Sequence, residues 1–98
     1  MSPRLIIRPE AEQEMADGFD WYEERVPGLG SDFLLCVDAT LNSILRQPQQ
    51  YPHVHRVVRR ALTRRFPYEV FFVDDAERVV VLSVFHAKRN PKRWQERI

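Results

Sequence analysis

The stretch FPYEVFFVDDAERVVVLSVFH, residues 66–86, decides the fold class of this 98-residue chain. Two apolar runs, 66–73 and 78–86, are joined by the polar residues 74–77, which predicts a β-hairpin. Both runs are apolar on both faces near their middles, so at least one strand is expected to be central and covered. Regular alternation along 78–86 would place Val80, Leu82, Val84 and His86 on one side and Val79, Val81, Ser83 and Phe85 on the other.

The segments before this hairpin predict further strands. Residues 55–62, HRVVRRAL, are β-branched and basic, and a strand there would extend the hairpin to a meander. Residues 4–8, RLIIR, form a short apolar run that Pro9 ends, which predicts a strand at the start of the chain.

Two helices are expected between these strands. The first begins at Pro9 with an acidic first turn, which suits the positive end of the helix dipole. The second is expected to be capped by Ser31 and to end at 47–52, QPQQYP, where the prolines remove backbone donors. Two apolar stripes mark the buried faces: Met15, Phe19, Tyr22 and Val26 on the first helix, and Phe33, Val37, Leu41 and Ile44 on the second. The order β-α-α-β-β-β predicts an α+β domain, a helical hairpin packed on a mainly antiparallel sheet.

Composition narrows the class of protein. Residues 1–98 have the length of one domain, and no apolar run approaches the ~18 residues that a membrane helix needs. The single cysteine, Cys36, cannot form an internal disulfide, and together with three histidines it lacks the paired spacing of a zinc site. We therefore expect a cytoplasmic protein without a metal or cofactor, and a buried, inert Cys36.

Charge is unevenly distributed along the chain. Residues 1–50 carry 4 Arg/Lys and 9 Asp/Glu, a net charge of 4 − 9 = −5, whereas residues 51–98 carry 11 and 5, a net charge of 11 − 5 = +6. A basic half of this kind indicates an acidic partner or nucleic acid, and a solvated basic face is the alternative. Charge alone leaves both interpretations open.

A longer pattern gives the chain a family resemblance. In residues 64–94, paired arginines, an apolar residue, proline and tyrosine precede two strands, and the second strand is followed by a basic pair, Asn-Pro and Trp94. With the helix exit ILRQPQQYP (44–52) and the order of elements, this segment resembles the RelE/ParE superfamily of bacterial type II toxins, and its ending is most similar to the ParE-like branch. The resemblance implies the RelE/ParE-like β-α-α-β-β-β fold and a toxin of a plasmid stabilisation-like module that a cognate antitoxin holds inactive.

The resemblance leaves two targets open. ParE-like members poison DNA gyrase and are not ribonucleases, whereas RelE-like members are metal-independent ribonucleases that cleave mRNA on the ribosome. For the ribonuclease, the resemblance implies Arg65 as the phosphate-binding group and His86 as the acid/base, roles that suit a bidentate guanidinium and a group titrating near neutrality. RelE-like ribonucleases usually also have a C-terminal tyrosine or comparable residue and a basic cluster that contains lysines. In this chain no tyrosine follows Tyr68, and the only lysines are Lys88 and Lys92. The resemblance therefore favours a gyrase-binding toxin over an enzyme.

The remaining candidate residues are basic. We expect contacts with the target or the antitoxin from Arg59, Arg60, Arg64, Arg65, Lys88, Arg89, Lys92, Arg93 and Trp94. Each has a structural alternative: Arg64 and Arg65 could flank a strand or pair with Glu69 and Asp74, and Trp94 could anchor the tail by burying its ring. A third hypothesis is a non-toxic relic or a basic binding module that kept the fold.

Overall fold

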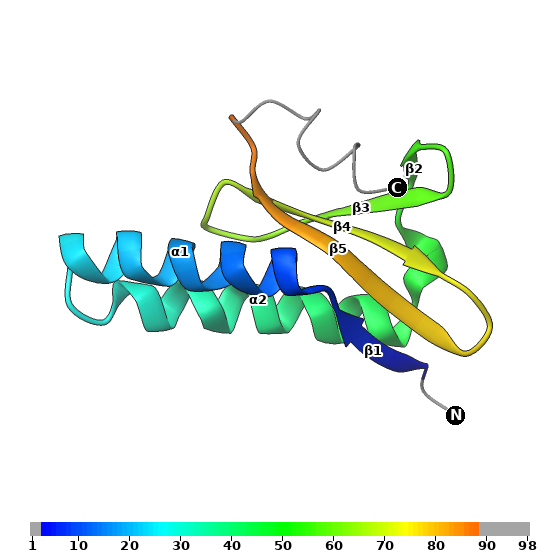
Figure 1. The fold of residues 1–98 in the computed structure, drawn as a ribbon, viewed down its shortest axis with the longest axis horizontal. Coiled ribbons are helices and arrows are strands. Elements are labelled where there is room, and N and C mark those ends of the chain that lie inside the picture. Colours follow the sequence, from blue (N-terminus) through cyan, green and yellow to red (C-terminus); the bar gives the residue numbers. More distant parts are fainter. Residues whose placement is uncertain (1–2, 89–98) are drawn as a thin grey trace.

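The computed structural model describes residues 3–88, which form two helices packed on a five-stranded sheet (Figure 1). The elements in chain order are β1 (Arg4–Ile7), α1 (Pro9–Arg25), α2 (Leu29–Arg46), the short 3₁₀ helix η1 (Pro48–Gln50), β2 (His53–His55), β3 (Val58–Leu62), β4 (Tyr68–Asp74) and β5 (Arg78–His86). In the sheet they follow the order β1-β5-β4-β3-β2, with β1 parallel to β5 and every other pair antiparallel. The predicted α+β architecture is confirmed.

The strand expected over 55–62 is divided in two. The chain turns at Arg56 and Val57, so that β2 pairs with β3 and adds a fifth, outer strand. Arg56 has a φ of 53°, in the left-handed region that the favoured turns of two-residue hairpins use at their first turn residue. The continuous β-branched run hid this turn because it lacks the usual Asn-Gly or Asp-Gly signal.

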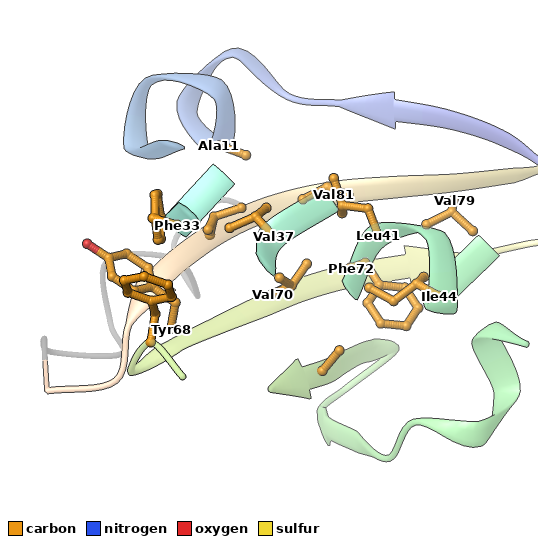
Figure 2. Close-up of a cluster of buried hydrophobic side chains, with 13 residues drawn as sticks. Ala11, Phe33, Val37, Leu41, Ile44, Tyr68, Val70, Phe72, Val79 and Val81 are labelled. Carbon is orange, nitrogen blue, oxygen red and sulfur yellow. The ribbon is translucent and has the colours of Figure 1, made fainter. Parts of the chain in front are cut away.

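The predicted stripe on α2 forms the centre of the core. Phe33, Val37, Leu41 and Ile44 are all at most 4% exposed. Figure 2 shows the side chains of α2 directed onto those of the sheet, among them Val70, Phe72, Val79 and Val81. Helix α2 therefore supplies most of the apolar surface that covers the sheet.

Helix α1 approaches α2 through small residues. Gly18 is buried, and a Cβ there would lie 2.6 Å from a ring carbon of Phe33, so only glycine lets that ring contact the backbone of α1. Tyr22 is half-buried beside the same ring, with the two ring centroids 5.3 Å apart. Val26, which was expected on the buried stripe, is instead 53% exposed because α1 ends at Arg25.

The start of α2 is capped from the neighbouring helix. Ser31 was predicted as the N-cap, but the N-cap is Gly28, three residues earlier, with a φ of 90°. The Glu23 carboxylate of α1 accepts hydrogen bonds from the amides of Gly28 at 2.9 Å and Gly30 at 3.0 Å. A negative group at a helix N-terminus satisfies free amides and the dipole together, so Glu23 takes the role that Ser31 would have had.

A β-bulge reverses the alternation of β5. Phe71 pairs with Ser83 and Phe72 pairs with Val81, so Leu82 is the extra residue of β5. Val84 consequently joins Val79 and Val81 in the core under the helices, and His86 contacts Tyr68 on that side. Leu82 and Phe85 join a second buried cluster, with Val58 and Phe71. The side assignment expected from regular alternation is therefore wrong from Val84 onward.

The bulge is fastened to α1 by Glu14. One carboxylate oxygen of Glu14 accepts hydrogen bonds from the Ser83 hydroxyl at 2.9 Å and from the Val84 amide at 3.3 Å. Ser83 is fully buried, so its hydroxyl needs a partner within the protein. Glu14 therefore ties the register of β5 to the position of α1.

Glu14→Ala is expected to lower the free energy of unfolding by about 1–3 kcal/mol, because it leaves the buried Ser83 hydroxyl without this acceptor. Glu14→Gln keeps an acceptor oxygen and should retain most of the stability. Urea unfolding followed by circular dichroism measures both variants. Equal losses in the two variants would show that the hydrogen bonds are not the source of the effect.

The β4–β5 turn is closed by Asp75. Its Oδ1 accepts hydrogen bonds from the amides of Glu77 at 2.9 Å and Arg78 at 2.8 Å. These backbone hydrogen bonds, first that of Glu77, hold the pKa of Asp75 below its ordinary value. Arg78 also lies 3.2 Å from the second carboxylate oxygen, so this arginine serves the turn.

Candidate functional site

The paired arginines 64 and 65 lie in the loop between β3 and β4. The Phe66 amide donates to the carbonyl of Arg64 at 2.7 Å, which makes a three-residue turn centred on Arg65 with a φ of 67°. The Arg65 guanidinium is 3.7 Å from the Asp32 carboxylate of α2 and 5.2 Å from the centroid of the Phe66 ring. The alternative in which Arg64 and Arg65 pair with Glu69 and Asp74 is not what the structure has, since Arg65 pairs with Asp32 and Asp74 pairs with Arg59.

Arg59 forms hydrogen bonds that link three parts of the fold. Its Nε donates to Asp74 at 2.7 Å and its Nη1 donates to the carbonyl of Tyr51 at 2.6 Å, with the side chains of Arg59 and Asp74 only 15% and 12% exposed. It thereby joins β3, β4 and the loop after η1. A contact with a partner would require these hydrogen bonds to break. Arg59, predicted as a contact residue, therefore stabilises the fold.

Arg60 lies on the face of the sheet away from the helices, where its partner on β4 is Phe71. Its Nε is buried and is the one buried side-chain polar atom among residues 3–88 without a hydrogen-bond partner. Arg59 and Arg60 are thus on opposite faces, as neighbours in a strand must be.

A groove runs between α2 and the β3–β4 loop, with a volume of about 650 Å³. We name it the α2 groove, and its lining consists of Asp32, Leu35, Cys36, Ala39, Thr40, Ser43, Arg46, Gln50, Tyr51, Leu62, Arg64 and Arg65. Leu35 and Leu62 are 66% and 61% exposed, so the groove has apolar surface in contact with solvent. Cys36, expected to be buried, is half-buried at this groove.

The chemistry of the α2 groove is that of a site for an amphipathic acidic segment. Exposed leucines offer apolar surface, while Arg46, Arg64 and Arg65 supply guanidinium groups around it. Guanidinium groups bind carboxylates with two parallel hydrogen bonds and keep their charge at any physiological pH. The sequence analysis predicted a contact role for Arg64 and Arg65 but missed Arg46 and Leu35. The only signal for Leu35 was that it is a leucine outside the buried stripe of α2.

His86 lies at a different place. With Asp17, Gly18, Trp21, Tyr22 and Tyr68 it lines a second cavity, of about 330 Å³, which we name the α1 hollow. Its ring is in edge contact with Tyr68, with 5.2 Å between centroids, and its Nδ1 accepts a hydrogen bond from the Lys88 amide at 3.2 Å. Arg65 and His86, the residues predicted as a catalytic pair, thus line separate cavities.

Several predicted contacts cannot be placed. Lys88 is exposed at the end of the described chain, whereas Arg89, Lys92, Arg93 and Trp94 lie outside residues 3–88. Within those described residues, there is no group of three or more His, Cys, Asp or Glu side chains that could hold a metal ion. No helix in this part of the chain is long and apolar enough to cross a membrane.

Comparison with known proteins identifies the family. The model of the family described as the ParE toxin of the type II toxin–antitoxin system parDE matches residues 5–91. The chain belongs to the ParE toxin family. The match includes both cavities and all of the sheet except Arg4, so the resemblance seen in residues 64–94 extends over nearly the whole protein.

A solved structure supports the fold of this ParE-family chain. It is described as the chromosomal ParDE TA system from P. aeruginosa and has a TM-score of 0.79 at 14% sequence identity, covering 89% of this chain and 98% of that one. Identity this low supports the shared fold alone. A search of curated proteins found no significant match. Membership in a toxin–antitoxin family implies a cognate antitoxin for the ParE chain.

The basic residues of the ParE chain should separate experimentally into two groups. Arg59→Ala is expected to lower the free energy of unfolding by about 2–3 kcal/mol. It removes charged hydrogen bonds and leaves the mostly buried carboxylate of Asp74 without its arginine partner. Arg64→Ala, at an exposed position, should change it by less than about 0.5 kcal/mol. Guanidinium chloride unfolding of the two variants measures the difference, and similar values would contradict the division.

Proposed function

We propose that this chain is a growth-inhibiting toxin that binds DNA gyrase and is neutralised by a cognate antitoxin. Membership in the ParE toxin family, over residues 5–91, is the observation that carries the proposal. The ending HAKRNPKRW (86–94), which resembles the ParE-like branch, supports gyrase as the target over the ribosome.

The arrangement of His86 and Arg65 favours a protein that binds over one that cleaves RNA. A metal-independent ribonuclease needs its phosphate-binding group and its acid/base within reach of the same phosphate. Here Arg65 lines the α2 groove and His86 lines the α1 hollow. The Nδ1 of His86 also accepts a hydrogen bond from the Lys88 amide, which occupies one of the two nitrogens that could carry a proton.

The target can be tested in bacteria that express this chain without an antitoxin. DNA synthesis and protein synthesis are pulse-labelled in parallel after induction, for the natural chain and for His86→Ala. We expect DNA synthesis to stop first and the cells to filament, with both proteins, because binding to gyrase does not require an acid/base group. Purified protein should correspondingly inhibit supercoiling by gyrase.

The opposite order of events would replace this proposal. Collapse of protein synthesis within minutes, while DNA synthesis continues, would support the ribosome-dependent ribonuclease, particularly if His86→Ala abolished it. Unchanged synthesis of both kinds, with soluble folded protein in the cells, would leave the chain without toxic activity and contradict the proposal.

We place the antitoxin on the α2 groove. Exposed Leu35 and Leu62 beside Arg46, Arg64 and Arg65 suit an acidic segment with an apolar face, laid into the groove as a helix or as an extended chain. Complementary charge on the rim speeds association, since long-range attraction steers the partner before contact. This placement accounts for paired arginines in a loop whose fold does not need both.

Arg46→Glu with Arg64→Glu is expected to slow association with the antitoxin by about tenfold or more at low salt, and the difference should shrink as salt is added. Arg4→Glu with Arg56→Glu makes the same change of charge at exposed positions outside the groove and serves as the matched control. Surface plasmon resonance gives the association rates. Equal slowing in the two double variants would indicate an effect of net charge and would contradict binding at this groove.

A further inference from the structure

The α1 hollow is a small aromatic cavity that the proposed toxin function does not use. Its walls come from two turns of α1, with Asp17, Gly18, Trp21 and Tyr22, and from the paired strand residues Tyr68 and His86. Its volume of about 330 Å³ is at the lower end of the range for ligand-binding cavities, which suits one side chain better than a nucleotide.

Aromatic rings line most of this cavity. Tyr22 makes edge or tilted contacts with Trp21 at 5.0 Å and with Tyr68 at 6.3 Å between centroids. Burial raises the pKa of Tyr22, so its phenol stays neutral across the physiological range. Trp21 is 51% exposed at the rim of the hollow. An exposed tryptophan at a cavity gives an incoming group a large ring face to contact.

The charges that α1 places around the hollow are mainly negative, although the Arg25 guanidinium stacks on the Trp21 ring. Asp17 is the carboxylate of the cavity wall, and the Gln13 side chain holds it by donating to its Oδ1 at 2.9 Å. Asp20 and Glu24 are also exposed on α1, three and seven residues further along, and they lie on the same side of the helix. An aromatic cavity with a carboxylate at its wall and further carboxylates nearby attracts a cation and repels a phosphate.

The protein itself already stacks one guanidinium on the ring of Trp21. The Cζ atom of Arg25 lies 3.4 Å from the centroid of the Trp21 ring, and its Nη1 donates to the Trp21 carbonyl at 2.8 Å. Trp21 therefore has the position and exposure to stack with a planar cation. A second guanidinium that entered the hollow would meet the carboxylate of Asp17 as well as the rings.

We propose that the α1 hollow binds an arginine side chain of a partner polypeptide. A guanidinium is planar, stacks on aromatic faces and pairs with a carboxylate through two parallel hydrogen bonds. A lysine ammonium is compact and strongly hydrated, so it loses more hydration energy in a cavity whose walls are mostly rings. The proposal concerns another cavity than the α2 groove, and it does not depend on the identity of the toxin's target.

The test uses the full-length chain, labelled with ¹⁵N, and follows its amide and indole signals by NMR. The probes are N-acetyl-arginine-N′-methylamide, the corresponding citrulline compound, which has nearly the same shape without the charge, and the corresponding lysine compound. The Trp21 indole signal is assigned from the spectrum of Trp21→Phe. We expect the arginine compound to bind with a Kd on the order of 1 mM and to shift the signals of Trp21 and Gly18 most. The citrulline and lysine compounds should bind at least about fivefold more weakly.

Two variants with the same change of charge locate the site. Asp17→Asn should weaken binding of the arginine compound by about five- to tenfold, because it removes the carboxylate of the cavity wall. Asp20→Asn, on the same helix but outside the wall, should weaken it by less than about twofold. Both residues are exposed, so neither substitution should affect folding, and circular dichroism checks this.

Three results would overturn the inference. Equal binding of the arginine and citrulline compounds would show that the hollow recognises shape or apolar surface and not charge. Equal weakening by Asp17→Asn and Asp20→Asn would assign the effect to the net charge of α1. An absence of shifts at Trp21 and Gly18 up to the solubility limit of the arginine compound would show that the hollow does not bind a guanidinium.

Discussion

The hydrogen bonds from Ser83 and Val84 to Glu14 fix the register of β5, and this register decides which face of the sheet each later residue of the strand occupies. They hold the bulge in β5, the strand that lies between β1 and β4. Because of the bulge, Val84 and His86 face the helices and Phe85 faces away. With regular alternation, His86 would point to the other face and the α1 hollow would lose a wall. A carboxylate on a helix thus determines which strand residues can serve the cavity beside that helix.

The arginines of this protein fall into two groups: some form ion pairs within the sheet, and others are exposed around the α2 groove. Arg59 and Arg78 bind Asp74 and Asp75, and so hold the strands and the turn of the sheet. The arginines around the α2 groove, by contrast, are exposed. Net charge by itself therefore overstates the surface available to a partner. The relevant quantity is the number of cations whose hydrogen bonds the fold does not already use.

The sequence predicted well those features that repeat with a regular period. The stripe of α2, from Phe33 to Ile44, and the bounds of the strand 78–86 follow directly from spacing. The bulge could not be predicted, because the run VVVLSVF is apolar on both faces and carries no signal of a changed register. The cap of α2 was also hidden, since Glu23 reaches Gly28 and Gly30 only after the two helices have packed.

The two cavities were beyond sequence reasoning for a related reason. Leu35 and Leu62 both line the α2 groove although 26 residues lie between them in the chain, and Asp17 and His86 both line the α1 hollow although 68 residues lie between them. Sequence patterns describe neighbours along a helix or strand, whereas a cavity forms where elements far apart in the chain come together. The resemblance to a toxin family predicted the fold and roles for single residues such as Arg65 and His86. It did not predict either cavity.

The conformation of Arg65 shows how the β3–β4 loop is adapted to the α2 groove. A φ of 67° costs a residue with a side chain about 1–2 kcal/mol. Its ion pair with Asp32 is exposed and contributes at most about 1 kcal/mol, so the pair does not clearly offset that cost. Glycine would remove the strain but also the guanidinium. The strained turn keeps a cation at the end of the groove, held against α2 before any partner arrives, and a preorganised cation loses less conformational entropy when it binds a carboxylate.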